Sequence, residues 1–339
     1  MSLPTFEDVL AASERIHPYV HRTPILTSSL LDSWLTPEEM EREGAGHRIF
    51  FKVECLQRTG AFKLRGATNV LAWLKENDRL PEHIVANSSG NHAQAIAYAA
   101  SLFDIPATIF TTASVSRVKA AATEYYGAEL ALFDTRTQAD DAVQEAAGQP
   151  GVLWIPPFNH SQIIAGQGTA ALEALQDLKQ VDGVFTPVGG GGLISGTLLA
   201  SRELCPDAQV IGAEPLIAND AANSLRQGRI VRLDGSPQTL ADGAATPAVG
   251  DLTFPFLQQL DGFYEVEEAQ IAYWTQWLQH LLKIHVEPTS AMSMAAVVGW
   301  LQEQDSPSTT LVILSGGNID QQRMQQIWAE DYLDQPPIL

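Results

Sequence analysis

Four consecutive glycines, Gly189, Gly190, Gly191 and Gly192, stand between a short apolar run and a helical pattern. A glycine-rich turn at the start of a helix exposes backbone N–H groups, which bind phosphate well. The alternative is a tight turn between a strand and a helix, which seldom needs so many glycines. The dinucleotide spacing G-x-G-x-x-G fails, because Ile194 or Ser195 stands where its last glycine is required. We therefore expect this turn to bind one terminal phosphate.

Lys63 is the second group that could do chemistry, and it lies in the segment TGAFKLRGA between small residues and Phe62. Taken alone, it would be a solvated lysine at the start of a helix over residues 66–77. Next to a phosphate site it has another interpretation, because a desolvated lysine is a competent amine nucleophile. Lys63 is therefore a candidate for forming a Schiff base.

Short apolar or β-branched runs alternate with helical patterns along the chain, and they would position these groups. The predicted strands are residues 82–87, 106–111, 129–133, 182–188, 208–214 and 309–314. Such alternation indicates βαβ units and a mostly parallel sheet with helices on both faces. Ligands bind beyond the carboxyl ends of such strands, where the polar or glycine-rich segments 88–92, 189–192 and 315–318 fall. The pattern predicts an α/β enzyme or small-ligand binder whose two lobes pack around a shared cleft.

Composition excludes several other classes of protein. The chain has 339 residues, with 20 basic and 40 acidic side chains and a formal net charge of −20, which disfavours nucleic acids and anionic membranes as partners. No apolar run is long enough to span a membrane, and the N-terminus has no secretory pattern. Cys55 and Cys205 lack metal-ligand spacing, and Cys55 is expected to be a small core residue. We expect a reduced, soluble, cytoplasmic protein.

Six blocks occur in an order typical of one family: KVECLQRTGAFKLRGA, SSGNHAQA, IAGQGT, PVGGGGL, VEPTSA and LSGGN. Over residues 20–320 the chain resembles the fold-type II pyridoxal-phosphate enzymes, in particular serine racemase and the serine/threonine dehydratases. The resemblance implies two open, mostly parallel sheets with flanking helices, as in the β subunit of tryptophan synthase, and an active site between the two lobes. It implies a large domain of residues 1–75 and 158–339, a small mobile domain of residues 76–157, and a homodimer.

The resemblance also implies roles for the residues that would hold pyridoxal 5′-phosphate. Lys63 would form the Schiff base with the cofactor and then act as the base at the substrate Cα. The other cofactor-binding residues would be Phe62 against the ring, Gly189, Gly190, Gly191, Gly192 and Leu193 at the phosphate, Asn91 at the ring hydroxyl, and Ser315 at the pyridine nitrogen. A hydroxyl at that nitrogen leaves it neutral, which favours elimination over transamination.

Substrate binding is implied for the segment SSGNH. Ser88, Ser89, Asn91 and the backbone near His92 would hold the substrate carboxylate, and the imidazole of His92 would be structural. Dehydratases usually have SAGNH here, whereas serine racemases resemble SSGNH. Ser89 would then supply the second acid/base group that racemisation needs, on the cofactor face opposite Lys63. The alternative is a buried serine that hydrogen-bonds to the backbone.

A cation site is implied after the strand that ends near Glu214. Its oxygen ligands would be the carboxylate of Glu214, the carbonyl of Ala218 and the carboxylate of Asp220, which suit Mg²⁺ or Ca²⁺. Two carboxylates near a helix start are otherwise ordinary partners of the helix dipole.

These observations lead to one interpretation and several alternatives. We expect an L-threonine/L-serine dehydratase (an ammonia-lyase) that acts on a small amino acid and gives 2-oxobutyrate or pyruvate plus ammonia. The main alternative is a serine racemase that uses Lys63 and Ser89. A threo-3-hydroxyaspartate dehydratase is less supported, because Asp140 stands where dicarboxylate-binding relatives have an arginine and Arg136 is misplaced by a helical turn. A non-catalytic ligand binder or an NAD-dependent enzyme is the alternative from a different class.

Overall fold

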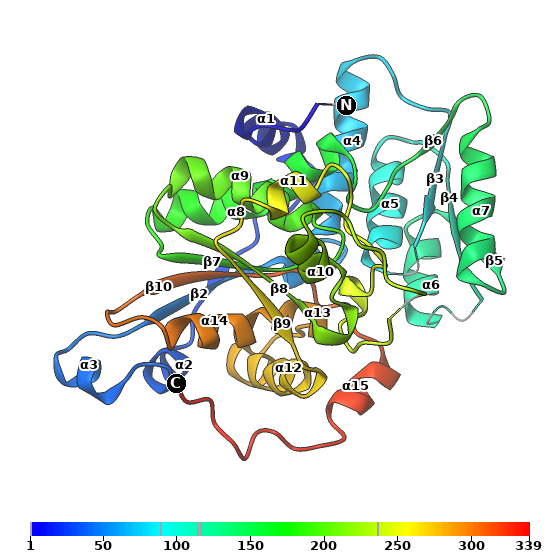
Figure 1. Cartoon of the computed structure of the whole chain (residues 1–339). Helices are drawn as coiled ribbons and strands as arrows, with labels where there is room; N and C mark the ends of the chain where they lie inside the picture. Colours follow the sequence, from blue (N-terminus) through cyan, green and yellow to red (C-terminus); the bar gives the residue numbers. More distant parts are fainter. Residues whose placement is uncertain (1, 89, 114, 116, 236) are drawn as a thin grey trace.

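The computed structural model describes residues 2–88, 90–113, 115, 117–235 and 237–339. The chain forms two lobes, each built on its own sheet (Figure 1). The larger sheet has six strands in the order β1-β2-β10-β7-β8-β9, and all neighbours are parallel except β1 and β2. Its strands are β1 (Ile25–Leu26), β2 (Arg48–Val53), β7 (Gly183–Pro187), β8 (Gln209–Pro215), β9 (Gly262–Val266) and β10 (Thr309–Leu314).

Apolar side chains cover both faces of the larger sheet. Along β10, Leu311 and Ile313 pack into one core cluster, whereas Val312 and Leu314 pack into another. This alternation follows from the two-residue period of a strand, and both faces must be covered by helices. On one side of the sheet lie α1 (Phe6–Ile16), α8 (Ser161–Leu178) and α9 (Gly192–Leu204). On the other side lie α12 (Glu268–Leu282), α13 (Pro288–Ala291) and α14 (Ser293–Leu301), as Figure 1 shows.

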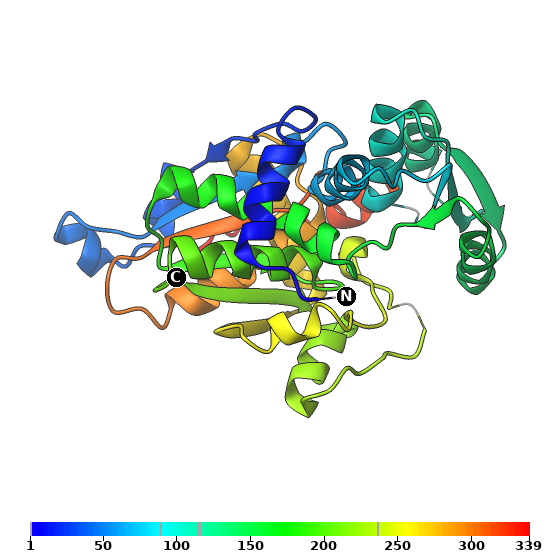
Figure 2. The same cartoon turned by 90° about the horizontal axis from the view of Figure 1, so that it is seen from above.

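The smaller sheet is wholly parallel and forms the core of the second lobe, on the right in Figure 2. Its strand order is β5-β4-β3-β6. The strands are β3 (His83–Asn87), β4 (Ala107–Thr112), β5 (Glu129–Phe133) and β6 (Val152–Trp154). Its helices are α5 (Asn91–Leu102), α6 (Arg117–Tyr125) and α7 (Arg136–Ala147). Helix α4 (Lys63–Glu76) lies between the lobes, because it packs against both α5 and α8.

The remaining elements are short and lie around the larger sheet. They are α2 (Ser29–Trp34), α3 (Glu38–Arg42), α10 (Asp220–Gln227), α11 (Phe254–Leu257) and α15 (Gln321–Ile327), with 3₁₀ turns at Glu54–Leu56, Leu216–Ala218 and Asp242–Ala244. Within the described residues, no helix is both long and apolar enough to span a membrane.

The predicted α/β class with two mostly parallel sheets is confirmed. All six predicted strands are present, and β5 and β10 have the predicted bounds. Strands β1, β2, β6 and β9 were not predicted. The helix expected over residues 66–77 begins three residues earlier, at Lys63. This earlier start places the lysine on the first turn of α4.

Candidate active site

The side chain of Lys63 turns inward at the N-terminus of α4. Its Nζ atom donates a hydrogen bond to the backbone oxygen of Pro157 at 2.6 Å and lies 5.0 Å from the centre of the Phe62 ring. Burial disfavours the ammonium form and lowers the pKa of Lys63 to about 8, although the carboxylate of Glu287 opposes this shift. At pH 7 about a tenth of the amine is therefore neutral, far more than in a solvated lysine, whose pKa is 10.5.

One cavity brings Lys63 together with most of the predicted cofactor residues. The cavity lies at the carboxyl ends of β7 and β10 and is lined by Phe62, Lys63, Phe158, Pro187, Gly189, Gly190, Gly191, Gly192, Leu193, Gly243, Thr289 and Ser315. Phe158, Gly243 and Thr289 were not predicted from the sequence. A larger residue at position 243 would displace Thr289, because a Cβ atom would lie 2.9 Å from its hydroxyl oxygen.

The glycine turn (residues 189–192) has no room for side chains. A Cβ atom at Gly190 would lie 2.2 Å from the Phe158 ring, and one at Gly189 would lie 2.9 Å from the backbone oxygen of Gly243. Gly191 also has a left-handed backbone with φ of +89°, which glycine adopts most readily. Among the described residues, the N–H groups of residues 189–191 have no backbone acceptor. The turn therefore presents free donors at the start of α9, as a phosphate site requires.

Ser315 lies directly after β10 with its hydroxyl buried. Its Oγ atom is 2.9 Å from Oγ of Ser290, and its carbonyl oxygen accepts a hydrogen bond from the Phe62 N–H at 2.9 Å. The end of β10 is thus bonded directly to the residue before Lys63. This contact explains how the lysine and Ser315 come to line one cavity.

Asn91 is held by Glu287 rather than by the cavity wall. Its Nδ2 atom donates to both carboxylate oxygens of Glu287, at 3.0 and 3.1 Å, and its Oδ1 atom accepts from Asn318 at 2.9 Å. Glu287 is 3% exposed, and burial raises its pKa to about 7. Glu287 was not predicted as a site residue; the signal in the sequence is an acid directly before a proline at the start of an apolar helical segment, VEPTSA.

The predicted substrate segment follows β3. Ser88 Oγ accepts a hydrogen bond from the Gly90 N–H at 3.3 Å, and Ser89 lies outside the described residues. The His92 ring nitrogen Nε2 is 2.9 Å from the carbonyl oxygen of Ile155. Burial, together with the charge of Lys63, lowers the pKa of His92 to about 3, so its imidazole stays neutral. This geometry agrees with a structural histidine.

Glu214, Ala218 and Asp220 lie together where β8 ends and α10 begins. Glu214 is buried and accepts hydrogen bonds from the N–H groups of Ala221 and Ala222, at 3.2 and 2.7 Å. Asp220 is also buried, and its carboxylate oxygens have no partner among the described residues. Burial raises the pKa of Glu214 to about 8 and that of Asp220 to about 7. The described residues contain no cluster of three or more His, Cys, Asp or Glu side chains, so a cation here would need carbonyl ligands as well.

Asp140 on α7 points toward the end of β3. Its Oδ1 atom accepts from Asn87 Nδ2 at 2.6 Å and from Arg136 Nε at 2.8 Å. Arg136 is therefore already paired with a carboxylate of its own helix. Asp140, the residue at which the resemblance leads one to expect an arginine in dicarboxylate-binding relatives, is thus half of an ion pair with Arg136 in the smaller lobe.

Comparison with known proteins identifies the family. A family model described as "Pyridoxal-phosphate dependent enzyme" matches residues 16–316. This chain belongs to the fold-type II pyridoxal-phosphate-dependent enzymes. An L-threo-3-hydroxyaspartate ammonia-lyase of Saccharomyces cerevisiae is 40% identical over 326 residues, which cover 95% of this chain and 96% of that relative. A serine racemase of Schizosaccharomyces pombe is 38% identical over 95% of this chain and 96% of its own.

Solved structures agree with this family. A crystal structure of a threonine deaminase matches with a TM-score of 0.85 and 39% identity, covering 94% of this chain and 99% of that one. The serine racemase of Dictyostelium discoideum matches with a TM-score of 0.83 and 37% identity, covering 94% of this chain and 100% of that one. The chain is thus a pyridoxal-phosphate enzyme of a group that contains ammonia-lyases and racemases. The cavity fits the cofactor of this family, because it joins a half-buried amine, free backbone donors for a phosphate and a buried hydroxyl.

Proposed function

We propose that this pyridoxal-phosphate enzyme is an L-threonine/L-serine ammonia-lyase, which eliminates water and ammonia to give 2-oxobutyrate or pyruvate. The proposal is supported above all by one observation: Lys63, the glycine turn and Ser315 line the same cavity. A lysine that binds the cofactor covalently, a phosphate cradle and a partner for the pyridine nitrogen are the three contacts that such chemistry needs.

The residues around the cavity have distinct tasks in this proposal. Residues 189–192 and the N–H of Leu193 bind the phosphate, Phe62 packs against the ring, and Asn91, whose amide is bonded to Glu287 and Asn318, is the proposed partner of the ring hydroxyl. Pyridoxal phosphate supplies an electron sink for the charge left on the substrate Cα. Lys63 takes the α-proton, and its pKa of about 8 suits a base that works near neutral pH.

Ser315 determines the electronic state of the ring in this proposal. Its hydroxyl is neutral and is held by Ser290, so it can pair with an unprotonated pyridine nitrogen. A neutral nitrogen moderates the electron sink and favours elimination over transamination. Together, Ser315 and Lys63 account for a lyase rather than an aminotransferase.

Asp140 supports threonine and serine as substrates over 3-hydroxyaspartate. A second substrate carboxylate needs a cationic partner when it leaves water. Here Asp140 supplies negative charge, and Arg136 is already bonded to it at 2.8 Å. A relative that is 40% identical has the name L-threo-3-hydroxyaspartate ammonia-lyase, so this substrate belongs in the test.

Serine racemisation is the second candidate, favoured by one sequence feature. The block SSGNH contains Ser89, and serine racemases are among the similar proteins. Both activities would share Lys63 as one base, and racemisation would add Ser89 as the second.

We also propose Mg²⁺ or Ca²⁺ at Glu214, the carbonyl of Ala218 and Asp220, because a cation there would compensate two buried carboxylates.

A substrate panel tests the proposed function. Purified enzyme loaded with pyridoxal phosphate is given L-threonine, L-serine and L-threo-3-hydroxyaspartate, with keto-acid and D-amino-acid readouts. We expect keto-acid formation from threonine and serine to exceed that from hydroxyaspartate by at least about tenfold in kcat/KM. D-Serine as the main product from L-serine, and its loss in Ser89→Ala, would make the racemase the better description. Hydroxyaspartate as the preferred substrate would overturn the argument from Asp140.

A further inference from the structure

The segment IAGQGT (residues 164–169) has no role in the site described so far, yet it joins the two helices whose N-termini form that site. It lies in α8, and its glycines allow close approach on both sides. A Cβ atom at Gly166 would lie 2.7 Å from Cα of Gly66 in α4. A Cβ atom at Gly168 would lie 2.7 Å from the backbone oxygen of Gly196 in α9. Helix α8 therefore fixes α4, which begins at Lys63, relative to α9, which begins in the glycine turn.

The first turn of α4 lacks the usual N-cap. The first N–H groups of a helix need acceptors, and a Ser, Thr, Asp or Asn side chain usually supplies one. Here the N-cap residue is Phe62, which has no side-chain acceptor atom and an αR backbone. Gln167 replaces this cap from α8, because its Oε1 atom accepts from the Gly66 N–H at 3.2 Å. The Gln167 side chain is 1% exposed, so water cannot take over this role readily.

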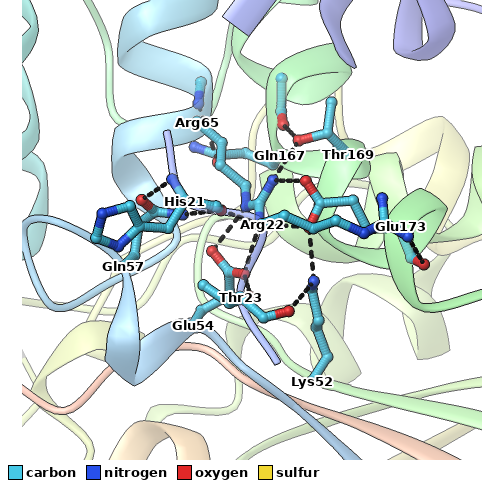
Figure 3. A network of polar contacts seen from close by, with 12 residues as sticks. His21, Arg22, Thr23, Lys52, Glu54, Gln57, Arg65, Gln167, Thr169 and Glu173 are labelled. Carbon is cyan, nitrogen blue, oxygen red and sulfur yellow. Dashed lines mark hydrogen bonds and ion pairs between the residues drawn. The ribbon is translucent and has the colours of Figure 1, made fainter. Parts of the chain in front are cut away.

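Arg65, two residues after Lys63, is clamped by a buried charge cluster (Figure 3). We define this cluster as Lys52, Glu54, Arg65 and Glu173, whose two positive and two negative charges balance. Arg65 donates two hydrogen bonds to Glu54, at 2.7 and 2.8 Å, and two to Glu173, at 2.8 and 2.9 Å. Its Nη1 atom also donates to Thr169 Oγ1 at 3.1 Å. Two bidentate ion pairs to one guanidinium restrict the rotation of the helix that carries the arginine.

We propose that Gln167 is a positioning residue for Lys63, and that Arg65 and Glu173 act with it. Gln167 holds the Gly66 N–H, and Arg65 anchors the same turn through the charge cluster, so α8 sets the direction in which the Lys63 side chain leaves its helix. This inference rests on the proposed role of Lys63. Small errors in such placement matter, since about 1 Å of misplacement can reduce a rate about 100-fold.

The test compares two glutamines on the same helix. Gln162, five residues before Gln167 in α8, also bonds α4, because Asn69 Nδ2 donates to its Oε1 at 3.0 Å, but this contact lies further along α4 from Lys63. Gln167→Met and Gln162→Met each remove one acceptor between the helices and keep the side-chain length. Gln167→Glu retains an acceptor oxygen, and the replaced Nε2 atom has no hydrogen-bond partner among the described residues.

Each variant is measured in four ways: unfolding temperature of the apoprotein, affinity for pyridoxal phosphate, visible absorbance of the loaded enzyme against pH, and kcat. We expect Gln167→Met to lower kcat by roughly 10- to 100-fold and to shift the pH midpoint of the absorbance. Gln162→Met should lower the unfolding temperature by a similar amount with unchanged absorbance and kcat. Gln167→Glu, whose buried carboxyl group stays protonated, should restore both kcat and the pH midpoint. If Gln167→Met does not fold, Thr169→Val removes the Arg65 contact and is judged by the same criteria.

Two outcomes separate this inference from the proposed function. Borohydride reduction followed by peptide mass analysis shows which lysine carries the cofactor in the wild-type enzyme. A label on another lysine overturns the proposed role of Lys63 and this inference together. A label on Lys63, with absorbance and kcat equal in the two methionine variants, overturns the positioning role alone.

Discussion

The Nζ atom of Lys119 in α6 lies 2.6 Å from Oδ2 of Asp242, so one ion pair joins the smaller lobe to the edge of the cavity. Asp242 begins the 3₁₀ turn that supplies Gly243 to the cavity wall. The Lys119 side chain is 12% exposed, and Asp242, with further help from Glu287 and Asp320, raises its pKa although burial opposes the shift. The amine stays charged while the lobes are in contact.

Removing this ion pair should weaken substrate binding more than chemistry. In Lys119→Met we expect KM for threonine to rise about threefold to tenfold with a smaller change in kcat, because the pair favours the arrangement in which the lobes enclose the substrate. Steady-state kinetics at low and high salt checks this, since the wild-type KM should rise with salt and the variant's should not. Arg42→Met, which removes an exposed ion pair with Glu38, is the control. Equal KM values in Lys119→Met and wild type contradict the prediction.

Lys63 should determine how fast the apoprotein captures its cofactor. Only the neutral amine attacks an aldehyde, so below the Lys63 pKa of about 8 the rate should rise about tenfold per pH unit and level off above it. Stopped-flow absorbance after mixing with pyridoxal phosphate measures this rate. Lys63→Ala should show no covalent phase, whereas Lys75→Ala, an exposed position on the same helix, should behave as wild type. A midpoint of the curve of rate against pH near 10.5, the ordinary pKa of lysine, would show that burial does not lower the pKa of Lys63.

The pair Glu214 and Asp220 should make stability depend on both pH and divalent cations. Burial in the folded chain raises the pKa of Glu214 from 4.5 to about 8 and that of Asp220 from 3.8 to about 7. Between the lower and the higher pKa of each group, the unfolded chain binds fewer protons than the folded one. The free energy of unfolding without cation therefore falls as the pH rises through that window. A bound cation favours the ionised carboxylates and compensates this loss.

Thermal unfolding with Mg²⁺, with Ca²⁺ and with chelator checks this prediction near about pH 5 and about pH 8. The cation should raise the unfolding temperature more at the higher pH, because protons compete for the same oxygens. In Asp220→Asn the cation effect should largely disappear. A cation effect that is the same at both pH values, or intact in the variant, contradicts a site at these residues.

Asp140 should discriminate against substrates with a second carboxylate. In Asp140→Arg we expect the ratio of kcat/KM for L-threo-3-hydroxyaspartate to that for L-threonine to rise by about tenfold or more, because a guanidinium replaces a carboxylate. Competition assays with both substrates give this ratio directly. Asp141→Arg, the same charge change at the next, exposed position of α7, should leave it unchanged. Similar ratios in Asp140→Arg and Asp141→Arg would show that Asp140 does not discriminate against a second carboxylate.

Arg65 should be among the most sensitive positions for stability. Arg65→Met leaves Glu54 and Glu173 buried with Lys52 as the one remaining cation of the cluster, and breaking such a cluster costs about 3–5 kcal/mol of the free energy of unfolding. Urea unfolding of the apoprotein measures it. Arg22→Met, which removes a half-exposed pair with Asp177, should cost less than about 1 kcal/mol. Comparable losses of unfolding free energy in Arg65→Met and Arg22→Met would show that the charge cluster adds little to stability.

Features that depend on local pattern could be predicted from the sequence. Strands β5 and β10 were located because runs of apolar residues end at polar or glycine-rich segments. The glycine turn and Lys63 were found because their residue types are unusual at those places. Strand β2, by contrast, includes the buried charge Lys52, whose partner Glu173 lies far along the chain, so its pattern alone does not indicate a buried strand.

Contacts between distant segments explain what was missed. The first turn of α4 is bonded to Gln167, and Asn91 is bonded to Glu287 and Asn318; in each case the partners lie far apart in sequence. Phe158 enters the site because it fills the space left by Gly190. These relationships arise only when the chain folds, and no local propensity encodes them.

Lys63, the glycine turn and Ser315 all extend from the larger sheet and its helices, whereas Asn87, Asp140 and the substrate segment belong to the smaller one. The continuous stretch from β3 to β6 is therefore a natural cassette for making chimeras. We expect its exchange between family members to alter which amino acid is accepted and to leave Lys63, the glycine turn and Ser315 in place.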